Sequence, residues 1–186
     1  METKAQALEI AKTQLQLRGY NGFSFQDIAN ELGIKKASLH YYFSSKEDLG
    51  LALIEDYAAA FQQWADKLAE LSPYEKIEKY ILMFYSFAQD NLKICPAGVF
   101  CVDFNALPVR MQKSITELQD TQRRWLEKAL IRGIKDGDFK KSLKAKDTAN
   151  LLIAACQGGL QLARFQDNCR VMKSTCQTLL DLLTDI

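Results

Sequence analysis

The sequence is poor in proline, glycine and histidine, and it contains few runs typical of strands. Among its 186 residues, three are proline, nine are glycine and one is histidine. Because prolines and glycines end helices and mark turns, their scarcity favours helices joined by short turns. Apolar residues make up 48% of the chain and charged residues 25%. This is ordinary usage, and it excludes a disordered or collagen-like chain.

The cysteines fit neither a disulfide framework nor a zinc site. Their number is odd, no two of them have CxxC spacing, and a single histidine adds little to a metal-ligand set. The five are Cys95, Cys101, Cys156, Cys169 and Cys176. We therefore expect reduced thiols and no bound metal. The sequence also lacks a glycine-rich phosphate loop and a set of nucleophile, base and orienting group, so it predicts no cofactor and no enzyme.

Long uncharged apolar segments are missing as well. The first twelve residues, METKAQALEIAK, mix charge with apolar side chains and lack the core of a signal peptide. No later segment reaches the roughly eighteen uncharged residues that span a bilayer. We expect a cytoplasmic protein. Residues 1–50 hold six Lys or Arg and six Asp or Glu, so any contact with nucleic acid must be local.

Apolar residues recur at helical spacing along almost the whole chain. The pattern predicts an all-α protein of about nine helices, with a three-helix head at 1–46 and a helical body at 47–186. A long helix from Ser45 to about Leu71 would join the two parts. Ser72, followed by a proline and an acid, starts the next helix, which would reach about Leu92. The other helices are expected over 3–18, 24–33 and 36–43, after Gly98, from Pro108 to Gly137, and over 146–166 and 168–184.

Residues 24–46 have the pattern of a helix-turn-helix. Gly33 supplies a permissive backbone between two short helices, and small apolar residues such as Ala29 and Leu39 can pack between them. In such a unit the second helix enters the major groove of DNA. The side chains placed to contact DNA are Lys35, Lys36, Ser38, His40, Tyr41 and Tyr42. An isolated pattern of this kind also occurs as a plain helical corner.

Over residues 8–50 the sequence resembles the TetR family of bacterial regulators. The resemblance rests on an ordered series: Gly19-Tyr20, Ser24, Ile28-Ala29, Gly33-Ile34, Leu39-His40-Tyr41-Tyr42-Phe43 and Ser45-Lys46-Glu47-Asp48-Leu49. It implies phosphate contacts by Ser24, Tyr41, Tyr42 and Lys46, and base contacts by Lys36 and Ser38. Ala37 and His40 depart from the family pattern, where Gly and Tyr are common, and so bear on the operator sequence.

The resemblance further implies a homodimer on a two-fold operator, formed through the last two helices of each subunit. The first of these helices offers Leu151, Leu152, Ala155, Gly158, Gly159 and Leu162, and the second offers Met172, Cys176, Leu179, Leu180 and Leu183. The alternative is that these residues form the core of a single chain. A helical adaptor that binds protein instead of DNA is a further alternative.

The resemblance also implies that the protein is a repressor and that its body binds a small-molecule effector, which releases the protein from its operator. Aromatic residues at helical spacing are candidate lining residues, although such residues also form ordinary cores: Trp64, Tyr80, Phe84, Tyr85, Phe100, Phe104 and Trp125. Three polar residues lie among apolar ones, namely Asp103, Asn105 and Gln122. Because burial without partners is costly, they could orient an effector or satisfy one another.

Two cysteines suggest an alternative signal on the same DNA-binding scaffold. Cys95 and Cys101 flank the irregular stretch around Pro96 and Gly98, and an exposed thiol of lowered pKa could sense electrophiles or oxidants. Some TetR-family electrophile sensors carry a cysteine after the glycine of this stretch, where this chain has Val99.

Overall fold

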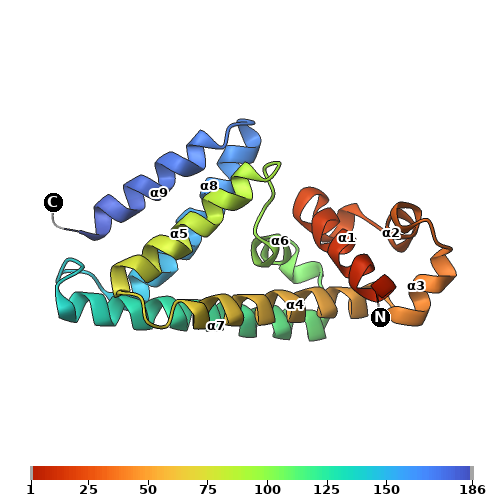
Figure 1. The fold of residues 1–186 in the computed structure, drawn as a ribbon, viewed down its shortest axis with the longest axis horizontal. Coiled ribbons are helices and arrows are strands. Elements are labelled where there is room, and N and C mark those ends of the chain that lie inside the picture. Colours follow the sequence, from red (N-terminus) through yellow and green to blue (C-terminus); the bar gives the residue numbers. More distant parts are fainter. Residues whose placement is uncertain (1, 185–186) are drawn as a thin grey trace. The chain divides into compact units, whose positions relative to one another are not determined.

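The computed structural model describes residues 2–184. For residue 2 it describes the backbone only. Within this part the chain forms nine α-helices, two short 3-10 helices and no strand (Figure 1). In chain order they are α1 (Glu2–Arg18), η1 (Tyr20–Gly22), α2 (Phe25–Leu32), α3 (Lys36–Tyr42), α4 (Lys46–Lys67), α5 (Pro73–Gln89), α6 (Pro96–Val102), η2 (Phe104–Ala106), α7 (Val109–Asp136), α8 (Ala145–Phe165) and α9 (Arg170–Leu183). The predicted all-α class and number of helices are confirmed.

Serine caps start α4 and α5 as the sequence predicts. Ser72 Oγ accepts a hydrogen bond from the Glu75 N–H at 3.2 Å, while the Glu75 carboxylate accepts one from the Ser72 N–H at 2.9 Å. Ser45 Oγ accepts from the Asp48 N–H at 3.0 Å. Each cap satisfies a backbone donor that has no partner inside the helix.

Three predicted helix boundaries are wrong. α5 ends at Gln89 and not near Leu92, because Asn91 and Leu92 have φ of 52° and 55°, outside the right-handed helical region. α4 ends at Lys67 and not near Leu71, because the chain tightens there: the Leu68 N–H bonds the Ala65 carbonyl and the Leu71 N–H bonds the Leu68 carbonyl, each three residues back at 3.1 Å. α6 begins at Pro96 and not after Gly98. Proline is well suited to the first turn of a helix, where its missing N–H is not needed.

The chain divides into two compact units, and the first consists of residues up to Gln63 together with Pro96–Leu118. Its core is built on α1, whose Ala7, Ala11 and Leu15 are fully buried and which contacts α2, α3 and α6. α4 and α7 approach closely at Gly50, where an added Cβ would lie 2.5 Å from Met111 Cε. This unit contains the predicted helix-turn-helix.

The second unit consists of Trp64–Cys95 and the chain from Gln119 onward. α5, α8 and α9 pack against one another in it (Figure 1). Much of the predicted dimer set lies in this unit's own core, namely Leu152, Gly159, Met172, Cys176, Leu179, Leu180 and Leu183. Leu151, Gly158 and Leu162 are exposed on α8. The helices described here include none with the length and apolar character of a membrane span.

Candidate DNA-binding interface and ligand site

α2 begins at a capping box that fixes the entry to the helix-turn-helix. The Asp27 carboxylate accepts hydrogen bonds from the Ser24 N–H and the Ser24 hydroxyl, both at 2.7 Å, and the Asp27 N–H reaches Ser24 Oγ at 3.4 Å. These bonds, with a smaller effect from Arg18, hold the pKa of Asp27 below its usual value. Ser24 itself is exposed. A residue implied to contact phosphate is thus held in place by its neighbour.

The turn between the two short helices depends on Gly33. Its φ of 68° and ψ of 28° lie in the left-handed region, which glycine adopts without steric cost. The Ile34 N–H bonds the Ala29 carbonyl at 3.0 Å, and the Gly33 N–H bonds the Asn30 carbonyl at 3.2 Å. This pair of bonds is the Schellman arrangement, which satisfies carbonyls at the end of a helix. The turn ends α2 and changes the direction of the chain before α3 begins.

α3 buries one side chain and presents the others to solvent. Leu39 is 1% exposed, whereas Tyr41 is 87% exposed. The helix, KASLHYY, has no acidic residue. Five of the predicted DNA contacts are exposed here: Lys35, Lys36, Ser38, His40 and Tyr41. Tyr42 is half-buried. Six of the eight predicted contacts therefore lie on α3 or directly before it, whereas Ser24 precedes α2 and Lys46 begins α4.

Ring contacts limit the freedom of three of these side chains. The His40 ring lies 4.9 Å from the Phe25 ring, measured between centroids, and the Tyr41 and Tyr42 rings meet edge to face at 5.3 Å. Ala37, the other departure from the family pattern, is exposed. Both departures thus lie where they could affect which bases are contacted.

Lys46, at the start of α4, is partly engaged inside the protein. Its Nζ donates a hydrogen bond to the Phe23 carbonyl at 2.7 Å and lies 4.8 Å and 4.9 Å from the ring centroids of Tyr20 and Phe23. Burial lowers the pKa of Lys46, and the charges of Asp103 and Asp27 oppose that effect. An ammonium group has three donors, so two remain for other partners.

The predicted effector candidates are divided between the two units. Phe100, Asp103, Phe104 and Asn105 belong to the first unit, where Phe100 lies against Tyr20 with ring centroids 5.7 Å apart. Trp64, Phe84, Tyr85, Gln122 and Trp125 belong to the second.

Of the three polar candidates, only Gln122 is buried, at 1% exposure; Asp103 is half-buried and Asn105 is exposed. The burial argument that singled out all three therefore applies to Gln122 alone.

Aromatic rings gather around Trp125 in the second unit. The Trp125 centroid lies 5.3 Å from that of Trp64 and 6.3 Å from that of Tyr80, and Tyr80 lies 5.3 Å from Phe84. Tyr80 is fully buried. Its pKa is raised well above the usual value by burial, with smaller effects from the neighbouring thiols of Cys156 and Cys95.

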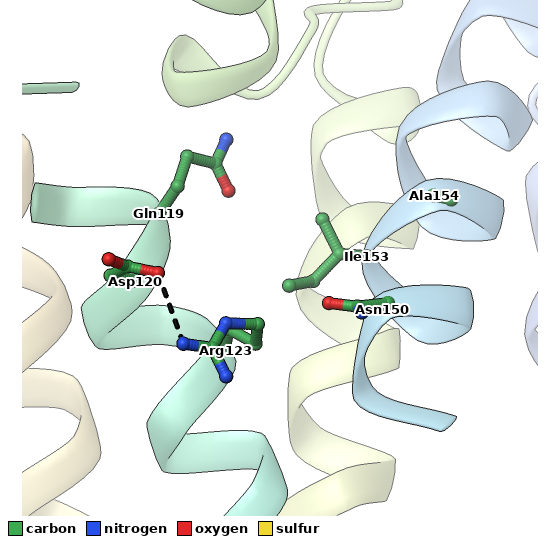
Figure 2. Close-up of a pocket in the computed structure, with 6 residues that line it drawn as sticks. All are labelled: Gln119, Asp120, Arg123, Asn150, Ile153 and Ala154. Carbon is green, nitrogen blue, oxygen red and sulfur yellow. Dashed lines mark hydrogen bonds and ion pairs between the residues drawn. The ribbon is translucent and has the colours of Figure 1, made fainter. Parts of the chain in front are cut away.

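A pocket of about 220 Å³ opens between α7 and α8 of the second unit, and the sequence did not indicate it. Figure 2 shows the residues of both helices that line it: Gln119, Asp120, Arg123, Asn150, Ile153 and Ala154. Arg123 bonds the carboxylates of Asp120 and Glu127, each at 3.1 Å. No effector candidate from the sequence lines this pocket. The lining combines polar, charged and apolar residues. These residues do not form an apolar pattern at helical spacing, which is the signal that selected the effector candidates in the sequence.

The two cysteines of the alternative signal have different surroundings. Cys95 is fully buried, and Cys101 is exposed on α6.

Two other cysteines of the second unit have raised pKa values. Burial raises the pKa of the Cys156 thiol, and it raises the pKa of Cys176 to about 11. Residues 2–184 contain no cluster of His, Cys, Asp or Glu suited to a metal ion.

Comparison with known proteins gives matches to both parts of the chain. Residues 7–53 match the family model described as bacterial regulatory proteins of the tetR family. Residues 73–179 match the model of the tetracyclin repressor-like C-terminal domain.

Individual relatives agree with these family models. A helix-turn-helix transcriptional regulator from the lacX 3′ region of Lactococcus lactis is 27% identical over 184 residues, covering 95% of this chain and 91% of that protein. The solved structure of a TetR transcriptional regulator from Legionella pneumophila is 32% identical, with a TM-score of 0.81 and 96% of each chain covered. A TetR-family regulator from Agrobacterium tumefaciens, 24% identical, shares the fold with a TM-score of 0.93 over 99% of this chain and 98% of its own. This chain belongs to the TetR family of DNA-binding transcriptional regulators.

Proposed function

We propose that this protein is a repressor that binds a two-fold DNA operator through α3 and is released by a small-molecule effector. The observation that carries the proposal is the exposed face of α3, where lysine, hydroxyl and ring donors stand without a carboxylate among them. Donors of this kind suit both phosphate oxygens and base edges. DNA binding would place the protein in the cytoplasm.

The donors of the head divide into two groups. Lys36 and Ser38, exposed early in α3, are proposed to contact base edges in the major groove. Ser24, Tyr41, Tyr42 and Lys46 are proposed to contact phosphates, and Lys35 and His40 lie on the same exposed segment. The phosphate contacts give affinity for any sequence, and the base contacts select the operator.

Selection of bound DNA tests this proposal. The full-length protein is incubated with random double-stranded DNA, and bound molecules are enriched and sequenced over several rounds. We expect one enriched motif with two inverted half-sites about one helical turn, or a multiple of it, apart. Enrichment of no motif would contradict specific DNA binding. A motif with a single half-site would contradict the two-fold operator.

An exposed apolar stripe on α8 supports the dimer. Leu151, Ala155, Gly158, Leu162 and Phe165 follow one another at spacings of four and three, so they share one face of the helix. Leu151 and Leu162 are more than half exposed, and Phe165 is 88% exposed. A second copy of the chain would remove this stripe from water, as a two-fold interface does.

Analytical ultracentrifugation tests the dimer directly. The native protein should sediment as a dimer, and Leu162→Glu should shift it to monomer, because the substitution puts a charge into an apolar contact. Gln161→Glu changes the charge of the neighbouring exposed residue and is the matched control. A native monomer, or equal shifts in the two variants, would contradict the proposed interface.

The effector acts by differential binding. A ligand with higher affinity for the conformation that does not fit the operator lowers operator affinity by the ratio of its two affinities. Of the effector candidates in the second unit, Gln122 has the largest need for a partner, because both polar atoms of its buried amide lack one.

A further inference from the structure

Four buried side-chain atoms of the second unit have no hydrogen-bond partner in the described part of the chain. They are the Tyr80 hydroxyl, both amide atoms of Gln122 and the amide nitrogen of Gln157. The three residues come from three different helices, α5, α7 and α8. A buried polar group that lacks a partner destabilises the fold, and such groups are rare in native proteins.

By helical spacing, two of the three residues share a helix face with residues that line the α7–α8 pocket, although neither is itself part of the lining. Gln122 is one helical turn after Gln119, which lines the pocket, and Gln157 is one turn after Ile153 and Ala154 on the other wall. Tyr80 is linked to Gln122 through Trp125, which lies one turn further along α7 and contacts the Tyr80 ring. Helical spacing and this ring contact thus connect the unpartnered atoms with the pocket inside the second unit.

The charges around this region disfavour an anion. At the pocket, Arg123 is bonded to both Asp120 and Glu127, which leaves one negative charge in excess. The three side chains with unpartnered atoms carry no formal charge. Burying an unpaired charge costs much more than burying a neutral polar group. A molecule that reaches these atoms should therefore be uncharged.

We propose that this region binds an uncharged small molecule with a carbonyl or hydroxyl group on an apolar body, held by Tyr80, Gln122 and Gln157. The glutamine nitrogens would donate to its oxygen, and the Gln122 oxygen would accept from a ligand hydroxyl or amide. The aromatic group of Trp64, Phe84 and Trp125 would contact the apolar body. The proposal rests on the proposed function in that this molecule would be the effector.

The variants Tyr80→Phe and Gln122→Leu give a first test that needs no ligand. Each removes unpartnered polar atoms while keeping a similar volume, so each should raise the thermal midpoint of unfolding by roughly 2–4 °C. Tyr74→Phe and Gln89→Leu, less buried positions of α5, are matched controls and should leave the midpoint unchanged. A fall in the midpoint for both Tyr80→Phe and Gln122→Leu would show that the groups have partners, and would overturn the proposal.

The second test uses a panel of small aromatic and alicyclic amides, ketones and alcohols, each with its carboxylic acid of the same shape. Ligand-observed NMR on the full-length protein should find neutral members that bind, with their acids binding at least tenfold more weakly. Tyr80→Phe and Gln122→Leu should each weaken the neutral binders by about tenfold, the loss expected for one hydrogen bond. No neutral binder, acids that bind equally well, or affinities unchanged in the variants would each overturn the proposal.

DNA binding by the same variants distinguishes a failure of the ligand proposal from a failure of the proposed function. If the ligand results fail while the variants and the native protein bind the selected operator, only the ligand proposal is wrong. If the native protein binds neutral ligands but no DNA, the proposed function is wrong and the site stands.

Discussion

Replacing Gly33 with alanine is expected to weaken the helix-turn-helix by a predictable amount. The residue has φ of 68°, and an added Cβ would meet no atom within 4 Å, so the cost comes from the backbone alone. A non-glycine residue in the left-handed region costs about 1–2 kcal/mol. Alanine recovers roughly 0.4–1 kcal/mol by restricting the unfolded chain. The net loss should be about 1 kcal/mol, by difference.

Hydrogen exchange of the amides in α2 and α3 measures this loss locally. Because about 1.4 kcal/mol corresponds to a factor of ten, exchange in these helices should be roughly fivefold faster in Gly33→Ala. Gly33→Asn is the control, since asparagine tolerates the left-handed region better, and it should exchange less rapidly than the alanine variant. Exchange in Gly33→Ala equal to the native rate would refute the left-handed turn.

Three further predictions concern single side chains. Lys46→Ala should weaken binding to all DNA sequences and lower the slope of log affinity against log salt by about one unit in fluorescence anisotropy; an unchanged slope removes Lys46 from the phosphate contacts. The lowered pKa of Asp27 means that its contribution to stability is present above about pH 4 and is lost as the pH falls through the lowered value. Urea unfolding from pH 6 to pH 2 should therefore show less acid loss for Asp27→Asn than for the native chain, and equal loss would contradict the capping box. Mild iodoacetamide should modify exposed Cys101 before buried Cys95, as mass spectrometry would show. Operator binding that changes while neither thiol is modified would reject thiol sensing.

The helices and the helix-turn-helix could be predicted because their signals are local. Ser24, Gly33 and Ser72 act on backbone groups within a few residues, so their effect is visible in a short stretch of sequence. The predicted end of α4 is wrong because the apolar stripe continues to Leu71, although the backbone has already tightened after Lys67. Apolar periodicity shows which face of a helix is buried. It does not show where the backbone hydrogen-bond pattern of the helix ends.

The residues of the proposed ligand region could be predicted only in part, because the region depends on contacts between distant segments. Gln122 stood out as a polar residue in an apolar stripe, and it is buried. Gln157 lies in a similar apolar stretch of α8 and could have been singled out by the same criterion. The pocket residues Gln119, Asp120 and Asn150 carry no comparable signal, since polar residues at such positions usually form a solvated helix face. Their meeting at one pocket depends on where the tertiary fold places α7 and α8.

The salt dependence of DNA binding tests the central claim most directly. Affinity for the selected operator is measured between 50 and about 300 mM salt for the native chain, for a Lys36→Ala and Tyr41→Ala double variant, and for Lys113→Ala, an exposed lysine of α7 that serves as the charge-matched control. We predict a linear fall of log affinity with log salt and native behaviour in the control. The double variant should lose more than tenfold in affinity while its total helical content, measured by circular dichroism, stays at the native value. Equal affinity of the double variant and the native chain would contradict the claim that α3 reads DNA.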